Sequence, residues 1–349
     1  MKAAVWYDQK DVRVEERAVK ELKANDVKVK VAWTGICGTD LHEYEIGPIL
    51  LPKDAPNLFS GESTPLVLGH EFSGILEEVG ENVTQFKIGD RVVVNPVKTY
   101  GINPPEVDRY DGIGSLGLHT DGSFAEYVVI EEQNVIAIPS DLPLDKAALV
   151  EPLSVSAQAI KEGNVKEGDS VAIFGCGPIG LFAIIAAKAA GAKDIFAFDL
   201  TDERLEKAKQ VGATHTLNTR NADPIKFIKE KYPNGVDASF EVAGVKPTFD
   251  SALAATKAKG EMVVIAIHAR DFEFNPVSLM LSGVRLSSSM GYEPETFKKS
   301  VDILMNKDID VTPIMTKKIQ LDDIVEEGFK SLSSDLSQAK ILVEVSGAI

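Results

Sequence analysis

The chain has 349 residues, more than one hydrophobic core usually organises, so two domains are expected. Hydrophobic residues make up 44% of the chain and charged residues 26%, a balance that excludes wholesale disorder. Because 53 acidic residues outweigh 37 basic ones, the formal charge of -16 argues against nucleic acid or an anionic membrane as a partner.

The cysteine count and the N-terminal residues bear on the compartment. Cys37 and Cys176 are too few for a disulfide framework, which suits a reducing environment. Charges at Asp8 and Lys10 interrupt any apolar segment of the length that a signal peptide needs. We therefore expect a cytoplasmic protein.

The first part of the chain, from residue 2 to about 139, is predicted to be β-rich. Short runs rich in Val and Ile are separated by turn residues, which is typical of strands. A stretch dense in Gly, Pro and Asp, from Asn95 to Gly122, predicts an extended lobe or loop. The clearest strands are expected at 27–33, 72–79, 91–94 and 125–130.

After Ala147 the hydrophobic period changes, because apolar runs of strand length alternate with amphipathic helical stretches. Repeated β-α-β order predicts a parallel sheet covered on both faces, so the whole chain is expected to be of the α/β class. Beyond residue 292 a helix at 294–305 and a strand at 340–345 are expected. The predicted strands of the sheet are 170–174, 194–199, 238–242 and 261–267, and the helices between them are 179–190, 202–211, 224–232 and 247–256.

A glycine motif joins the first of these strands to its helix. In Gly175-Cys-Gly-Pro-Ile-Gly180 the first glycine permits a tight turn, Gly177 lets the backbone approach a pyrophosphate, and Gly180 allows close helix–strand packing. The following helix begins at Pro178 and Ile179, and its N-terminus carries a partial positive charge. The motif predicts a dinucleotide site, although a glycine turn alone is a common feature.

The residue that ends the next strand indicates which dinucleotide binds. Asp199 follows Gly180 by 19 residues, the position of a carboxylate that accepts hydrogen bonds from the adenosine ribose. A carboxylate there also repels a 2′-phosphate, which favours NAD over NADP. Arg204 lies one helical turn further on, where it either reaches a phosphate or is an ordinary solvated charge.

Three short segments supply ligand types that zinc takes in proteins. They are Cys37-Gly-Thr-Asp-Leu-His42, then Gly69-His-Glu71, and Glu151-Pro152. Taken singly, Cys37 is as well explained as a small buried residue, His70 as a core histidine and Glu151 as a surface charge.

The order of these motifs resembles a known family. Gly69-His-Glu-Phe-Ser-Gly74, followed by Gly80 and Val83, is similar to the signature of the zinc-containing medium-chain dehydrogenase/reductase superfamily. Cys37-Gly-Thr-Asp, Glu151-Pro-Leu-Ser-Val155 and the glycine loop follow in the expected order over nearly the whole chain. The segments 37–47, 69–74 and 290–292 most resemble the branch of 2,3-butanediol and polyol (sorbitol) dehydrogenases.

The resemblance implies roles for the site residues. Cys37, His70 and one or both of Glu71 and Glu151 would bind a catalytic zinc, with Cys37, His70 and Glu151 as the resting set. Thr39 would pass on the substrate proton and His42 would receive it. The implied reaction is a reversible oxidation of a small vicinal diol to a hydroxyketone, 2,3-butanediol to acetoin, with NAD as the hydride acceptor.

The resemblance also implies an architecture. A GroES-like catalytic domain is expected at 1–153 and 293–349 around a Rossmann NAD-binding domain at 154–292, with the active site between them and a homodimer or homotetramer as the assembly. Members of this branch usually hold a second, structural zinc on four cysteines, and the lobe from Asn95 to Gly122 contains none. One catalytic zinc per subunit, and no structural zinc, is therefore predicted.

Two alternatives stay open at this point. A polyol dehydrogenase acting on sorbitol or xylitol, or a threonine dehydrogenase, would share every zinc and NAD residue. A nucleotide-binding protein without turnover would keep the fold, but it would not need Thr39 and His42 beside the metal ligands.

Overall fold

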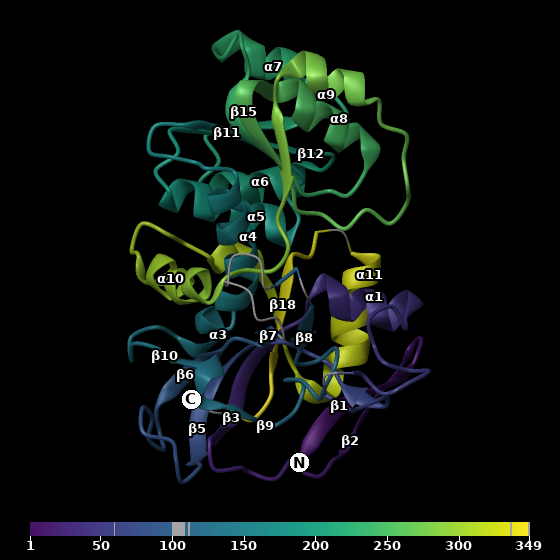
Figure 1. Cartoon of the computed structure of the whole chain (residues 1–349), viewed down its shortest axis with the longest axis vertical. Helices are drawn as coiled ribbons and strands as arrows, with labels where there is room; N and C mark the ends of the chain where they lie inside the picture. Colours follow the sequence, from purple (N-terminus) through teal and green to yellow (C-terminus); the bar gives the residue numbers. More distant parts are fainter. Residues whose placement is uncertain (59, 100–108, 111, 336, 348–349) are drawn as a thin grey trace. The chain divides into compact units, whose positions relative to one another are not determined.

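The computed structural model describes residues 1–58, 60–99, 109–110, 112–335 and 337–347, drawn in colour in Figure 1. Its contacts divide the chain into two compact units, Met1–Glu151 with Met315–Ile349, and Pro152–Ile314. The helix predicted at 294–305 lies in the second unit. The division of the chain into domains at residues 153 and 293 stays a prediction.

The first unit is built mainly of strands, as predicted. A three-stranded sheet has the order β2-β1-β4, and a larger sheet has the order β10-β6-β5-β3-β18-β17 with β9 paired to β3. In Figure 1 the yellow strand β18 lies near the purple strand β3, to which it is hydrogen-bonded although it comes some 300 residues later. The bounds are β1 Lys2–Asp8, β2 Asp11–Glu16, β3 Asp26–Gly35, β4 Leu66–Val67, β5 Glu71–Val79, β6 Arg91–Val94, β9 Tyr127–Glu131, β10 Val135–Ala137, β17 Met315–Gln320 and β18 Lys340–Glu344, with a separate hairpin of β7 Val97–Thr99 and β8 Ile113–Ser115.

This β-rich part of the chain contains one helix that was not predicted, at a position that matters for the site. Helix α1 (Gly38–Ile46) follows β3 directly, where no helix was predicted. Polar residues dominate its short sequence, and its N-terminal turn is closed by Asp40, whose side chain accepts a hydrogen bond from the Cys37 N–H at 2.9 Å. The remaining helical segments are α3 (Leu144–Ala147), η1 (Glu132–Asn134), η3 (Leu321–Asp323), the π-helical turn η4 (Ile324–Phe329), α11 (Lys330–Ser334), and α4 (Val150–Glu162), which runs on into the second unit.

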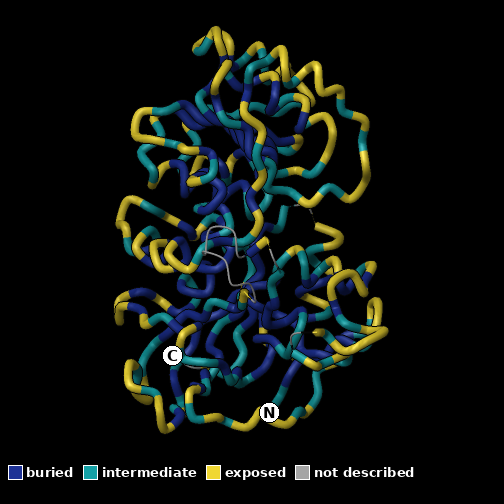
Figure 2. Tube along the Cα trace, in the orientation of Figure 1, coloured by how far each residue is buried: buried dark blue, intermediate teal, exposed yellow. Residues whose placement is uncertain are grey.

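Alternating burial explains how the strands of the first unit form a core. Val27, Val29 and Val31 of β3 are fully buried because successive side chains of a strand point to opposite faces. A second cluster centres on Phe124 and Phe329, whose rings meet edge to face at 6.3 Å. In Figure 2 the buried residues run along the strands, whereas exposed residues gather on turns and outer loops.

The second unit contains the predicted parallel sheet, in the order β13-β12-β11-β14-β15-β16. The α/β class is thereby confirmed. Two edge strands, β13 and β16, were not predicted, because their sequences carry one large apolar residue each, Leu217 and Leu286, and so lack the apolar run of a buried strand. The bounds are β11 Ser170–Phe174, β12 Asp194–Asp199, β13 His215–Asn218, β14 Val236–Glu241, β15 Thr256–Val264 and β16 Arg285–Ser288.

The helices of the second unit cover both faces of this sheet. The chain runs from β11 outward to β13, then returns to the other side of β11 at β14, and right-handed crossovers therefore place the two groups of helices on opposite faces. The carboxyl ends of β11 and β12, which carry the glycine loop and Asp199, meet at one edge of the sheet. Among the described residues, no helix is long and apolar enough to cross a lipid bilayer. The helices are α5 Pro178–Ala189, α6 Asp202–Val211, α7 Pro224–Lys231, α8 Lys246–Ala255, α9 Pro276–Ser282 and α10 Pro294–Met305, with a 3-10 turn η2 at Thr312–Ile314.

Candidate active site

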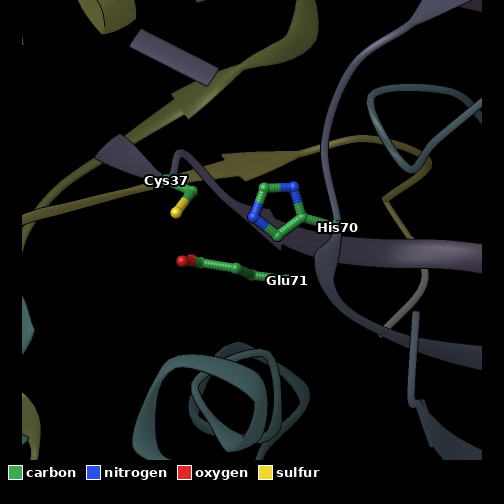
Figure 3. A group of neighbouring side chains, drawn as sticks. All are labelled: Cys37, His70 and Glu71. Carbon is green, nitrogen blue, oxygen red and sulfur yellow. The ribbon is translucent and has the colours of Figure 1, made fainter. Parts of the chain in front are cut away.

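Three of the predicted metal ligands meet in the first unit. Cys37 lies between the end of β3 and the start of α1, while His70 and Glu71 lie at the start of β5. The antiparallel pairing of β3 with β5 sets Gly35 opposite Glu71, so the two segments come together although they are far apart in the sequence. One donor atom from each of Cys37, His70 and Glu71 lies within 4.8 Å of the others, and Figure 3 shows the three side chains converging.

Asp40 joins the two segments that carry these side chains. Its fully buried carboxylate accepts hydrogen bonds from the backbone N–H groups of Cys37, at 2.9 Å, and Gly69, at 3.2 Å. One of its oxygens lies 3.6 Å from His70 Nδ1. Burial raises the pKa of Asp40, although His70 and the two backbone bonds act in the opposite direction. Asp40 therefore holds the segment that carries Cys37 and the segment that carries His70 in a fixed position relative to each other.

The electrostatics of the cluster favour a cation. Burial by itself lowers the pKa of His70, but the negative charges of Asp40, Cys37 and Glu151 outweigh burial and raise this pKa well above its usual range. His70 Nδ1 is buried without a hydrogen-bond partner among the described residues. A thiol, an imidazole and a carboxylate that attract positive charge into a buried position match the donor set of a zinc site. The residues present thus fit a zinc ion.

Glu71 has a buried partner that the sequence analysis missed. Lys340 of β18 donates from Nζ to both carboxylate oxygens of Glu71, at 2.7 and 2.7 Å, and to the Ile36 carbonyl at 3.0 Å. Burial by itself lowers the pKa of Lys340, but the charges of Glu71, Cys37 and Glu151 outweigh it and raise this pKa. One signal in the sequence could have predicted this pair, namely a lysine at the start of an apolar strand, Lys340-Ile-Leu-Val343. A charged side chain in a buried strand needs a partner of opposite charge.

Glu151, the third ligand expected in the resting set, is not one of the three residues whose donor atoms lie within 4.8 Å of one another. It lies in the first turn of α4 with 8% of its surface exposed. Its charge contributes to the raised pKa values of His70 and Lys340. The choice between Glu71 and Glu151 as the third ligand stays a prediction.

The two residues expected to carry the proton lie on α1. Thr39 is half-buried, and its Oγ1 is 3.7 Å from Cys37 Sγ. His42 is exposed to solvent and follows Thr39 by three residues, so both side chains lie on the same face of the helix. The arrangement places a hydroxyl beside a metal donor, and an imidazole exposed to water one helical turn further along.

The glycine loop has the geometry of a dinucleotide-binding turn. Gly175 has a φ of 109°, a conformation that side chains disfavour, and a Cβ at Gly180 would lie 1.9 Å from the Gly175 carbonyl oxygen. A Cβ at Gly177 would meet no atom within 4 Å, so the space beside this residue is open. Pro178 is the first residue of α5, and the N–H groups of Ile179 and Gly180 point along the helix axis without intrahelical partners. These groups are available for a pyrophosphate.

Asp199 holds this loop in place. Its Oδ2 accepts a hydrogen bond from the Cys176 N–H at 2.8 Å, and its Oδ1 accepts from the N–H of Leu200 at 2.8 Å. Arg204 approaches the same carboxylate at 3.8 Å. The thiol of Cys176 is 1% exposed, and burial raises its pKa, so it is an inert residue of the loop.

The cysteine-free lobe is held partly by hydrogen bonds to a neighbouring loop. Thr120 donates to Glu62 Oε1 at 2.8 Å, Lys20 pairs with the same oxygen at 2.8 Å, and Ser60 donates to the His119 carbonyl at 2.5 Å. Leu116 and Leu118 of the lobe are buried. The part of the predicted lobe at 100–108 and 111 lies outside the described residues.

Comparisons with known proteins show the family of this chain. A family model described as "Alcohol dehydrogenase GroES-like domain" matches residues 23–140, and one described as "Zinc-binding dehydrogenase" matches residues 178–306. The chain belongs to the zinc-containing medium-chain dehydrogenase/reductase superfamily, and is thus an oxidoreductase with a GroES-like and a Rossmann-like part.

Individual relatives cover almost the whole chain. The chain is 40% identical over 344 residues to (R,R)-butanediol dehydrogenase of Bacillus subtilis, with 98% of this chain and 99% of the relative aligned. It is 32% identical over 353 residues to sorbitol dehydrogenase of the same organism, with 98% and 97% aligned. The crystal structure of 2R,3R-butanediol dehydrogenase from Bacillus subtilis superposes with a TM-score of 0.92, covering 98% of this chain and 99% of that one.

Proposed function

We propose that this chain catalyses the reversible oxidation of a small vicinal diol to a hydroxyketone, with 2,3-butanediol and acetoin as the first pair to test and NAD as the hydride acceptor. The observation that carries the proposal is the convergence of Cys37, His70 and Glu71 in a chain 40% identical to a butanediol dehydrogenase over nearly its full length. A diol suits this site because its second oxygen offers the metal another donor.

In this proposal Cys37 and His70 hold a zinc ion together with Glu151 or Glu71. When bound, the zinc acts as a Lewis acid that lowers the pKa of a substrate hydroxyl by several units. Asp40 keeps the backbone of Cys37 and of Gly69 in position through its two hydrogen bonds. Because it acts through other residues, Asp40 positions the ligands and does not touch the substrate.

Thr39 and His42 move the substrate proton to solvent. The Thr39 hydroxyl can accept a proton from the substrate while it donates its own, since a hydroxyl is both donor and acceptor. The exposed imidazole of His42 then exchanges the proton with water. A nucleotide-binding protein without turnover would need neither residue, and this disfavours the non-catalytic alternative.

NAD is the proposed cofactor and fits the loop of the second unit. NAD supplies the hydride acceptor when bound. The N-terminus of α5, with Ile179 and Gly180, binds the pyrophosphate, and Asp199 accepts hydrogen bonds from the adenosine ribose. Asp199 also repels a 2′-phosphate, while Arg204, 3.8 Å from it, is neutralised by the same carboxylate.

A polyol such as sorbitol or xylitol is the second candidate substrate, supported by the 32% identity to a sorbitol dehydrogenase. Threonine is a third. Reduction of NAD should be measured with each stereoisomer of 2,3-butanediol, sorbitol, xylitol and threonine. We expect the highest kcat/KM with one butanediol stereoisomer. Higher values for sorbitol or threonine would replace the proposed substrate while leaving the metal site standing.

The metal is tested on the same preparation. We expect one zinc per chain by mass spectrometry, because the only cysteine outside the glycine loop is Cys37 and four thiolates for a second zinc are absent from the sequence. Cys37→Ser should lose most of the zinc and most of the turnover, with Cys176→Ser as the matched control. A metal-free protein that keeps full turnover would contradict the zinc mechanism.

We further propose that the chain assembles as a homodimer or homotetramer through α9 and β16. Val277, Met280 and Leu281 of α9 are 49%, 71% and 77% exposed, and no residue of this helix is charged. β16 is an edge strand with Leu286 37% exposed. A sheet edge can pair with its own copy across a twofold axis, and the uncharged surface of α9 lets two chains of charge -16 approach. The cytoplasm remains the proposed location.

A further inference from the structure

Two histidines of the second unit bind buried carboxylates at opposite edges of the parallel sheet. His215 Nε2 lies 2.9 Å from an oxygen of Asp194, the first residue of β12. His268 Nε2 lies 3.0 Å from Oε2 of Glu241, the last residue of β14. Because the strands run parallel, Glu241 lies at the carboxyl edge, where the glycine loop follows β11. The pair of His268 and Glu241 has no role in the proposed reaction, although it lies at the edge of the sheet that carries the cofactor loop.

Glu241 is an internal anion at the N-terminus of α8. Its side chain is fully buried, and Oε1 accepts hydrogen bonds from the N–H groups of Ala243, at 3.0 Å, and Gly244, at 2.9 Å. The Thr248 hydroxyl donates to the same oxygen at 2.6 Å. Because a carboxylate only accepts, Nε2 of His268 carries the hydrogen and donates to Oε2. A buried carboxylate is stable only when it is bound, so these donors and Glu241 fix the turn at 243–244.

The turn that Glu241 holds packs against the glycine loop. Strand β14 pairs with β11 so that Glu241 lies opposite Phe174, the residue before Gly175. A Cβ at Gly175 would lie 3.1 Å from both the backbone nitrogen and the Cβ of Ala243. The same Ala243 nitrogen donates to Glu241. The position of the buried carboxylate and the position of the glycine loop are therefore coupled through one residue.

His268 joins the segment after β15 to this carboxylate. Its Nδ1 is buried and has no hydrogen-bond partner among the residues that the structure describes. The ring also packs on Phe249 and Phe272, with ring centroids 6.5 and 5.2 Å away. In the same segment the N–H of Ile265 donates to the Glu241 carbonyl at 2.9 Å. The bond from Nε2 is thus the polar contact that fixes the imidazole, and it ends on the carboxylate that holds the turn.

From this geometry we infer that His268 is a positioning residue for the cofactor, which acts through Glu241 to hold the 243–244 turn against Gly175. The inference rests on the proposed NAD site and adds to it a residue that shapes the glycine loop without contact with NAD. Without the imidazole, Oε2 of Glu241 loses its donor. The carboxylate then turns toward water, and its hold on the N–H groups of Ala243 and Gly244 weakens.

Isothermal titration calorimetry with NADH tests the inference on the full chain. We expect His268→Ala to raise the Kd for NADH by about fivefold or more, since removing a hydrogen bond to a charged group has an effect of at least this size. His268→Gln should stay within about twofold of wild type, because its amide nitrogen can replace Nε2 as the donor. A role in packing alone would not be rescued by glutamine.

His215→Ala is the matched control, because it removes the other imidazole that binds a buried carboxylate of the same sheet. It should lower the urea midpoint and leave the Kd for NADH within about twofold of wild type, since it lies at the opposite edge. Thr248→Val removes a second donor to Glu241 and should raise the Kd in the same direction as His268→Ala. This variant decides the matter if His268→Ala does not fold.

The inference is overturned by a folded His268→Ala with the wild-type Kd, or by a Thr248→Val with the wild-type Kd when His268→Ala does not fold. A His268→Gln as weak as His268→Ala, or a His215→Ala that weakens NADH binding equally, would overturn it as well.

Failure of this inference and failure of the proposed function give different results. If the wild type binds no NADH, the proposed cofactor is wrong and the inference falls with it. If the wild type binds NADH and His268→Ala binds it equally well, the cofactor site stands and only the role of His268 is wrong. Turnover of a diol has no part in this measurement, so a different substrate would leave the result valid.

Discussion

Gly177 and Gly180 differ in what an added side chain would meet, and this separates cofactor binding from folding. A Cβ at Gly177 meets nothing within 4 Å, whereas a Cβ at Gly180 would lie 1.9 Å from the backbone oxygen of Gly175. Gly177→Ala should therefore keep the free energy of unfolding within about 0.5 kcal/mol of wild type. We expect it to weaken NADH binding at least about tenfold, or about 1.4 kcal/mol, because the methyl group fills the space beside the pyrophosphate.

Gly180→Ala is the matched comparison at the same loop. We expect it to destabilise the protein by about 3 kcal/mol or more, since backbone atoms cannot move aside as a flexible side chain does. Urea denaturation and NADH fluorescence titration measure the two quantities. Equal losses of stability in both variants would show that the open space at Gly177 is structural and not a binding feature.

Asp199 and Arg204 are expected to act in opposite directions on the choice between NAD and NADP. Asp199→Asn keeps an oxygen that can accept from the Cys176 and Leu200 N–H groups, while it removes the charge that repels a 2′-phosphate. The ratio of the Kd for NADPH to that for NADH should fall by about fivefold or more, since a unit charge a few ångströms away contributes about 1 kcal/mol or more. Adding Arg204→Gln should reverse much of this fall. An unchanged ratio in Asp199→Asn would mean that the carboxylate does not select NAD.

At the scale of elements, one polar cluster ties β12, β13 and α7 of the second unit together. Asp194 is 4% exposed and accepts from Lys231 Nζ at 2.5 Å and from the Tyr232 hydroxyl at 2.6 Å, with His215 Nε2 at 2.9 Å. Burial by itself raises the pKa of Asp194, but these partners outweigh it and lower the pKa far below its usual range. Burial and the bond to Asp194 raise the pKa of Tyr232 to about 12.

The sign of the pH dependence follows from these two shifts. The folded protein holds Asp194 ionised, so this stabilisation is present above about pH 4 and is lost as the pH falls further. Tyr232 is held neutral, so its stabilisation is complete below about pH 10, the usual pKa of tyrosine, and is lost as the pH rises toward 12.

Tyr232→Phe tests the cluster with a change of one atom. We expect it to lower the free energy of unfolding by about 1.5 kcal/mol, the lower end for a hydrogen bond to a charged group. The difference from wild type should be constant near neutral pH and should shrink above about pH 10. Tyr110→Phe, in the first unit, is the control. A difference that does not change at alkaline pH would contradict the role assigned to the hydroxyl.

At the scale of the whole molecule, the exposed apolar residues of the second unit predict self-association. Met280→Asp and Leu281→Asp place negative charges on α9, and each should weaken assembly by about 2 kcal/mol or more if this face is the centre of the contact. Ile88→Asp, at a residue 64% exposed in the first unit, is the control. Sedimentation velocity over a range of concentrations measures the result. Unchanged assembly in both α9 variants would place the contact elsewhere.

The sequence was sufficient to predict those features that lie within one strand–turn–helix unit. The glycine loop was predictable because Gly175, Gly177 and Gly180 act within six residues, and each requires only a backbone conformation or a close approach. Asp199 was predictable because it ends the next strand. Helix α1 and strands β13 and β16 were missed, since their short polar sequences carry little periodicity and their existence depends on neighbours.

The sequence by itself determined the α/β class, the dinucleotide loop and the kinds of side chain that can hold a metal, because these depend on composition, period and short spacing. Only the tertiary structure decided that Glu71 joins Cys37 and His70, and that Lys340 binds Glu71 across Gly35. The physical reason is that strand pairing between β3, β5 and β18 is long-range, so no local pattern states which residue of a later strand will face a given residue of an earlier one.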